Sequence, residues 1–375
     1  MMDKTKTFCK ASLVSIALVL LLVSSAALAA TENDTGNATI KDDYVSSTAM
    51  ANTEGSSLPK VTETQITTSG FHPAIYGNRI VWTDYHDEEC NIYMYDLSTK
   101  KETQITTSGD VSGSDIYGNR IVWSNYVYPN EVYMYDLSTS QKSTISGYNS
   151  YVDSLSIYGD KVVWGDSLDD YVSIFMHDLS TKEETLLTYD AYNPAIYGNR
   201  IVWEDRFDDN IYMYDISTKK QTRITNGGAA DDPAIYGNRI VYASTHDGNT
   251  DIYMYDLSTK KQTQITSSPD AQTHPAIYGN RIVWEDDGGE DDGYTNHGIY
   301  MYDISTNQKM KISTKGSAYS PTIYGNNIVW EYYNNENGKL RNLHGHYFRT
   351  KTEPSYCCIL CIPNFRKNTI KSYFY

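Results

Sequence analysis

The stretch Ile75-Tyr76-Gly77-Asn78-Arg79-Ile80-Val81-Trp82 occurs seven times, with small changes, in this chain of 375 residues. In every copy an aromatic residue stands five positions after the glycine. These aromatic residues, which include all six tryptophans of the chain, are Trp82, Trp123, Trp164, Trp203, Tyr242, Trp284 and Trp330. A unit that repeats about every 40 residues indicates a propeller or a solenoid, in which each unit buries its apolar face against its neighbours.

Each unit predicts four short strands, which we call strands A to D. In the first copy they cover residues 73–76, 79–84, 91–95 and 102–106. Gly77-Asn78 predicts a hairpin turn between strands A and B, because both residues tolerate the positive φ that primed turns require. An Asp-Leu-Ser-Thr turn before strand D offers side chains that bond nearby backbone amides.

The polarity of these strands predicts how the units are arranged. Strand B carries Ile80-Val81-Trp82, and strand C is also apolar at consecutive positions, so both faces of these strands must be buried. Sheets placed radially around an axis bury both faces against their neighbours, and four-stranded sheets in that arrangement form a β-propeller. Strand D is polar and suits the outer edge, where an exposed apolar strand would pair with other chains.

The ends of the repeat region predict the number of blades. Residues 61–67 resemble a strand D with no preceding strands, and residues 321–332 supply only strands A and B of a seventh unit. We therefore expect an all-β, seven-bladed β-propeller of four-stranded antiparallel blades over residues 61–335. Its last blade is incomplete and is closed by the N-terminal strand.

The segments that precede the propeller indicate export. Residues 1–29 have the basic start, the short apolar run and the Ala-Leu-Ala site of a secretory signal peptide. The apolar run is too short for the alternative, a retained membrane anchor. Residues 30–60 form a polar linker with glycosylation sequons at Asn33 and Asn37, a short pattern that also arises by chance.

The chain beyond the propeller differs in composition. Residues 336–375 form a divergent basic tail, and six Lys or Arg residues stand against one acidic residue after position 340. The expected Tyr-Met-Tyr-Asp strand is absent there. This change suggests a frameshifted or truncated gene end, and a genuine basic tail that binds a surface is the alternative.

Charge and cysteine content restrict the classes of partner and of crosslink. The formal net charge is −16, which argues against nucleic acid as a partner. Only Cys90 lies within the repeats, so disulfides are not expected to hold the blades together. No stretch after the signal peptide has 18 consecutive apolar residues, so no retained transmembrane span is expected.

The two faces of the predicted propeller differ. The A–B and C–D turns repeat with few changes, whereas the B–C and D–A loops vary in length and are acidic, and variable loops on a rigid scaffold tend to carry function. The candidate binding residues on this face are Asp84, Asp87, Glu88, Glu204, Asp205, Asp208, Asp286, Asp287 and Asp291. Such carboxylates could bind calcium, although the spacing is not that of an EF-hand. The alternative is a solvated acidic face with no cofactor.

The start of strand A should line the mouth of the central channel. The residues five positions before each repeat glycine are His72, Gly113, Ser154, Asn193, Asp232, His274 and Ser320. His72 and His274 would lie on either side of the seventh blade and could hold a transition metal. The alternative interpretation is that each His-Pro pair only begins its strand.

The repeat unit resembles the TolB-type β-propeller repeat of archaeal cell-surface (surface-layer-like) proteins. The resemblance rests on Ala-Ile-Tyr-Gly-Asn-Arg-Ile-Val-Trp, Ile-Tyr-Met-Tyr-Asp-Leu-Ser-Thr and Gln-Ile-Thr, and covers about residues 61–335. It implies an exported surface protein that acts in adhesion, envelope structure or protein contacts, and it implies no catalytic residues. The sequence also lacks a Gly-x-Ser-x-Gly elbow, a His-Glu-x-x-His pair and a phosphate-binding loop.

Two classes of function follow from these observations. We expect a non-enzymatic propeller at the cell surface or outside the cell, which presents its acidic B–C and D–A face to a protein or glycan. The alternative is a secreted propeller enzyme, such as a metal-dependent polysaccharide lyase, that uses His72 and His274 at the channel mouth.

Overall fold

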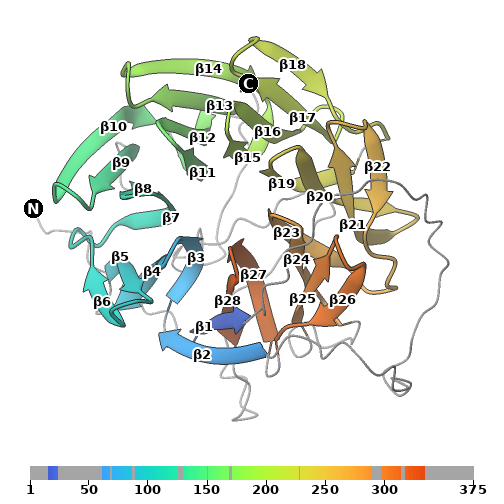
Figure 1. Ribbon diagram of the computed structural model, residues 1–375. Coiled ribbons are helices and arrows are strands. Elements are labelled where there is room, and N and C mark those ends of the chain that lie inside the picture. The colour runs from blue at the N-terminus through green and yellow to red at the C-terminus, as the bar shows by residue number, and fades with distance from the viewer. Residues whose placement is uncertain are drawn as a thin grey trace, which may run out of the picture.

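The computed structural model describes residues 16–23, 61–67, 70–86, 89–125, 130–149, 151–168, 171–227, 229–288, 297–313 and 317–333. Every regular element in these ranges is a β-strand, and none of the described residues forms a helix able to cross a membrane. The strands form a β-propeller whose sheets are arranged around a central axis (Figure 1).

Six blades of four antiparallel strands follow one another along the chain. They comprise β3 (Gly70–Tyr76), β4 (Arg79–His86), β5 (Glu89–Asp96) and β6 (Lys101–Gln104); β7 (Val111–Tyr117), β8 (Arg120–Asn125), β9 (Asn130–Asp136) and β10 (Gln141–Asn149); β11 (Val152–Tyr158), β12 (Lys161–Leu168), β13 (Tyr171–Asp178) and β14 (Glu183–Tyr189); β15 (Ala191–Tyr197), β16 (Arg200–Asp205), β17 (Asn210–Asp215) and β18 (Lys220–Arg223); β19 (Ala230–Tyr236), β20 (Arg239–His246), β21 (Asn249–Asp256) and β22 (Lys261–Gln264); and β23 (Gln272–Tyr278), β24 (Arg281–Asp286), β25 (Gly298–Asp303) and β26 (Gln308–Lys311). The first strand of each blade lies nearest the axis, and the fourth lies at the outer edge (Figure 1).

A further sheet contains strands from both ends of the described chain. Its order is β2 (Val61–Thr67), β1 (Ile16–Val23), β28 (Asn327–Tyr333) and β27 (Ser317–Tyr324). The N-terminal strand β2 occupies the outer edge, as the sequence predicts. Counted from the axis, the third strand of this sheet is β1, which pairs with both β2 and β28. The sequence predicts no strand for this position. Residues 16–23 belong to the apolar run of the predicted signal peptide.

The tryptophan position forms the packing layer between blades. Trp82, Trp203 and Trp284 are completely buried, and Tyr242, which replaces tryptophan in one copy, is 1% exposed. Ile80 and Trp82 pack with Val329 of the preceding sheet, whereas Val81 packs with Trp123 of the following blade. Consecutive apolar residues in strand B therefore face opposite neighbours, as the sequence predicts for radial sheets.

The A–B turns differ in one detail from the prediction. Gly77 has φ of +61°, but Asn78 does not have a positive φ. Only the first central residue therefore needs the conformation that favours glycine, which is the requirement of a type II′ turn rather than of type I′. The same pattern holds at the other six copies of the turn.

The repeated arginine after each A–B turn links neighbouring blades. Arg79 donates from Nη1 to Asn119 Oδ1 at 2.7 Å and to the carbonyl of Gly118 at 3.3 Å. Arg120, Arg200, Arg239 and Arg281 make the same pair of bonds to the next turn. The contacts between blades thus explain why the arginine and the A–B turn residues repeat with so few changes along the chain.

Candidate functional site

Seven polar side chains gather where the inner strands β15, β19 and β23 begin. We call this group the mouth cluster, and its members are Asn193, Glu204, Asp231, Asp232, His274, Glu285 and His297. They come from five inner or second strands and from the residue that precedes β25. The sequence predicts several of them separately, and the structure connects them through hydrogen bonds and ion pairs.

A break in strand pairing positions part of the cluster. In β19 and β23 the register shifts between Asp231 and Ala234 and between Thr273 and Ala276. Asp232 and His274 lie within these breaks, with φ of +49° and +50°. A β-bulge leaves its extra residue outside the ladder, and a left-handed non-glycine residue is uncommon enough to suggest a local role.

In three copies of the repeat, a glutamate directly after the tryptophan accepts the backbone N–H of the left-handed residue in the next sheet. Glu285 Oε2 accepts the backbone N–H of Ser320 at 3.2 Å, and Glu331 Oε1 accepts that of His72 at 2.7 Å. Glu204 receives the equivalent bond from the backbone of Asp232. The Trp-Glu pairs of the sequence therefore mark three contacts between sheets at the axis.

Glu285 connects two histidines. Its Oε1 lies 3.0 Å from Nδ1 of His297, and its Oε2 lies 3.4 Å from Nδ1 of His274. Burial would raise the pKa of Glu285, but hydrogen bonds from both histidines lower it to about 2. Desolvation opposes charge on His274, whose side chain is 45% exposed, yet Glu285, Asp232 and Asp231 outweigh it and raise the pKa of His274 to about 9. At neutral pH the pair is therefore ionic.

The other half of the mouth cluster holds carboxyl groups that retain protons. Burial, together with the charge of Asp232, raises the pKa of Glu204 to about 7. Burial and the charges of Asp232 and Glu204 raise the pKa of Asp231 to about 8. Asn193 Nδ2 lies 3.3 Å from both Glu204 Oε2 and Asp232 Oδ1, so it joins these carboxylates across two strands. The cluster thus has more carboxyl groups than histidines, and an added cation would favour ionisation of those that hold protons.

Several acidic residues predicted as loop ligands bond to protein groups. Asp84 is 3% exposed, and its Oδ2 accepts from Trp82 Nε1 at 3.1 Å. Asp205 accepts the N–H of Phe207 at 3.0 Å. Asp208 accepts from the hydroxyl of Tyr212 at 3.0 Å and lies 3.4 Å from Arg223 Nη1.

The longest B–C loop lies only partly within the described residues. Asp286 is 5% exposed and accepts the N–H of Gly288 at 3.4 Å, and Asp287 accepts that of Ala271 at 3.1 Å. The predicted ligands Asp87, Glu88 and Asp291 and the sequons at Asn33 and Asn37 lie outside the described residues. The linker and the basic tail also lie outside them.

The two histidines predicted as metal ligands begin inner strands on either side of β27. His72 belongs to β3 and donates its backbone N–H to Glu331, whereas His274 belongs to the mouth cluster. Across the part of the chain that the structure describes, no group of three or more His, Cys, Asp or Glu side chains is arranged to hold a metal ion.

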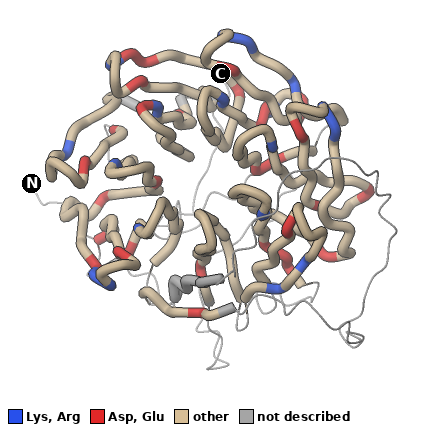
Figure 2. Tube along the Cα trace, in the orientation of Figure 1, with Lys and Arg blue, Asp and Glu red and all other residues tan. Residues whose placement is uncertain are grey.

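Sequence reasoning did not identify Glu285 as the centre of the cluster, nor Asp231 and His297 as its members. The signal for Glu285 is the Trp-Glu pair, which occurs in only some copies of the repeat. His297 has no comparable signal, because it ends a loop of variable length. Acidic residues occur in every sheet around the ring (Figure 2), so acidity alone does not locate the cluster.

The fold is similar to that of several known propellers. No protein-family model and no curated protein matches the chain. TolB from Acinetobacter baumannii is 17% identical, with a TM-score of 0.50 over 66% of this chain and 67% of its own. The β-propeller domain of the Trilobed protease from Pyrococcus furiosus is 13% identical, with a TM-score of 0.58 over 71% and 89%. An oligogalacturonate lyase in complex with manganese is 13% identical, with a TM-score of 0.50 over 70% and 88%. These structural similarities support a TolB-like β-propeller fold, and at such low identities they do not indicate a specific function.

Proposed function

We propose that this protein is an exported, non-enzymatic propeller of the cell surface, which binds a partner protein through the face that carries the mouth cluster. The observation that carries the proposal is the excess of carboxylates at this end of the axis. A cationic side chain of a partner would meet Glu204, Asp231 and Asp232 together. Its positive charge would favour the ionised forms of Glu204 and Asp231, on which burial and the neighbouring carboxylates now keep protons.

A seven-bladed ring is part of this proposal. The inner strands β3, β7, β11, β15, β19, β23 and β27 contact one another in a closed circle. The sheet that contains β27 therefore stands where a seventh blade would stand. A closed ring supports the proposal because it holds the loops of all sheets at fixed positions around one axis.

Export is proposed from the N-terminal sequence. Residues 1–29 have the pattern of a signal peptide, and the chain resembles archaeal cell-surface proteins with TolB-type repeats. Removal of this segment would also remove β1 from its sheet. The mature protein would then keep the pairing of β27 with β28, whereas β2 would need another segment at the position of β1 to join the sheet.

The second candidate function is that of a metal-dependent lyase. Its supporting observation is the mouth cluster itself, in which His274 and His297 flank a buried carboxylate. Metal analysis of the purified protein distinguishes the two candidates. A stoichiometric transition metal that is lost in the double variant His274→Ala, His297→Ala would favour the lyase.

A calorimetric titration with a tri-lysine peptide tests the leading proposal. Asp232→Asn should weaken binding by about tenfold, because it removes a carboxylate while asparagine tolerates the left-handed φ. Asp247→Asn is the matched control, since Asp247 is exposed at the β20–β21 turn and also has a positive φ. Absence of binding, or equal weakening by both variants, would contradict the proposal.

A further inference from the structure

A closed ring of tyrosines surrounds the axis at the end opposite the mouth cluster. We call it the tyrosine ring; its members are Tyr76, Tyr117, Tyr158, Tyr197, Tyr236, Tyr278 and Tyr324. Each is the last residue of an inner strand and precedes the left-handed glycine of the A–B turn. The aromatic centroids of neighbours are 4.6–4.8 Å apart, and the pair Tyr324–Tyr76 closes the ring at 4.7 Å.

Each phenol of the ring interacts electrostatically with both of its neighbours. These side-chain interactions join every neighbouring pair, from Tyr76–Tyr117 round to Tyr324–Tyr76. A phenol has one O–H donor and two acceptor lone pairs. A hydroxyl that donates to its neighbour leaves only lone pairs for a ligand. A ring of such oxygens therefore favours a cation over an anion.

Burial favours the protonated form of several of these hydroxyls. Burial and the neighbouring phenols raise the pKa of Tyr117 and of Tyr278 above the ordinary value. Burial and the neighbouring phenols raise the pKa of Tyr197 to about 12. These three hydroxyls are thus neutral over the physiological pH range. All seven tyrosines are nevertheless half-buried rather than fully buried, and a Cβ added to Gly77 or Gly198 would meet open space.

One carboxylate stands in the next layer along the axis. Asp115 lies two residues before Tyr117 on β7, and alternate residues of a strand face the same side. The equivalent positions in the other inner strands hold Ala74, Ser156, Ala195, Ala234, Ala276 and Thr322. Asp115 Oδ2 accepts the N–H of Ile157 at 2.9 Å and the hydroxyl of Ser156 at 3.2 Å. Burial raises the pKa of Asp115 to about 6, so it is ionised at neutral pH.

We propose that the tyrosine ring and Asp115 form an axial binding site for a weakly hydrated monovalent cation, the class that includes potassium and ammonium. A ring of neutral oxygens can replace the hydration shell of such an ion, as rings of carbonyl oxygens do in ion-selective proteins. One carboxylate balances one positive charge. A divalent ion would need more carboxylate ligands and would give up its water less readily. The site is independent of the partner that binds the mouth cluster.

Thermal melting of the full-length protein in potassium chloride or ammonium chloride tests the site, with choline chloride added to keep ionic strength constant. A ligand that binds the folded state raises the melting temperature in a saturable way. We expect this rise in the unmodified protein. Asp115→Asn, which removes the charge, and Tyr197→Phe, which opens the circle of hydroxyls, should each weaken apparent affinity at least tenfold.

Tyr255→Phe is the matched control, because Tyr255 lies on β21 and outside the tyrosine ring. It should retain the full response to both cations. Melting in choline chloride alone reports whether each variant is folded. NMR of thallium(I), used as a substitute for potassium, measures affinity without heating. The absence of a saturable response in the unmodified protein, or a response in both site variants equal to that of the unmodified protein, would overturn the proposal.

Discussion

Glu285 and Ser320 belong to neighbouring sheets, and Glu285 Oε2 accepts the backbone N–H of Ser320 at 3.2 Å. The same carboxylate binds His274 and His297 through its two oxygens. One buried side chain thus stabilises the contact between two sheets and orients the imidazoles of the mouth cluster. Stability and the electrostatics of the candidate site are therefore coupled at this residue.

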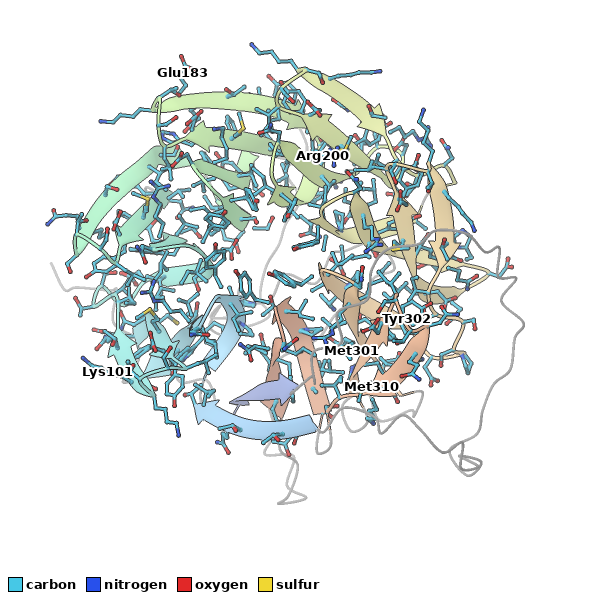
Figure 3. All side chains as sticks on the ribbon, viewed as in Figure 1. Lys101, Glu183, Arg200, Met301, Tyr302 and Met310 are labelled. Atoms are coloured by element: carbon cyan, nitrogen blue, oxygen red, sulfur yellow. The ribbon has the colours of Figure 1, made fainter. Side chains whose placement is uncertain are left out.

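Glu285→Gln separates these two roles. The pKa of His274 should fall from about 9 toward the ordinary histidine value, because the variant lacks the carboxylate that contributes most to raising it. Titration of the imidazole by NMR measures this change. Glu183→Gln is the control, since Glu183 lies on the outer strand β14 and points away from the ring (Figure 3). An unchanged pKa of His274 in Glu285→Gln would contradict the ion pair.

Stability should fall as the pH rises from 5 to 9. The folded-state pKa values of Glu204 and Asp231, about 7 and about 8, lie above their ordinary values, so the folded protein holds more protons than the unfolded chain in this range. The raised pKa of His274 acts in the same direction, since its contribution is lost as the pH approaches 9. Urea unfolding of Asp231→Asn should show a decline that is smaller by roughly 1–3 kcal/mol. An equal decline of the unfolding free energy in Asp231→Asn and in the unmodified protein would contradict the raised pKa of Asp231.

Trp330→Ala tests whether the sheet built from both chain ends is packed like the other blades. Trp330 is 1% exposed and packs with Val283 and Ile299 of the preceding blade. Truncation of a buried tryptophan typically costs about 3–5 kcal/mol of unfolding free energy. Trp203→Ala, in a blade formed by consecutive strands, is the reference. A negligible loss for Trp330→Ala beside a large loss for Trp203→Ala would mean that this sheet does not form.

Calcium should leave the melting temperature unchanged. The described acidic residues that were candidates for calcium binding already accept hydrogen bonds from the protein, as Asp84 does from Trp82 and Asp286 does from Gly288. These bonds would have to break before the oxygens could bind the ion. Melting with and without millimolar calcium measures this directly. A saturable rise in melting temperature would instead support the calcium hypothesis for the B–C loops.

The architecture could be predicted from sequence because its causes repeat. The spacing from Gly77 to Trp82 recurs in every copy, and it determines the A–B turn and the packing layer between blades at once. The strand boundaries in the structure differ from the predicted ones by a few residues; β3, for example, begins at Gly70 rather than Pro73. The position taken by β1 could not be predicted, since its pairing partners are more than 30 residues away and it reads as a signal peptide.

The candidate site was only partly predictable because its parts do not repeat. The position at the start of each strand A could be counted from the glycine, which predicted equivalent places for Asn193, Asp232 and His274, and the structure joins these three residues through Asp232. Asp231 and His297 join them through the β-bulge and through the end of a variable loop. Both depend on three-dimensional geometry that no local pattern encodes.

The most direct test of the central claim is the number of protons released when the tri-lysine peptide binds at pH 7.5. It is obtained from calorimetry in two buffers of different ionisation enthalpy. A cation at the mouth cluster should lower the pKa values of Glu204 and Asp231 together, and so release roughly half to one proton per peptide. The double variant Glu204→Gln, Asp231→Asn should release none. Binding without proton release in the unmodified protein would place the peptide elsewhere and contradict the account.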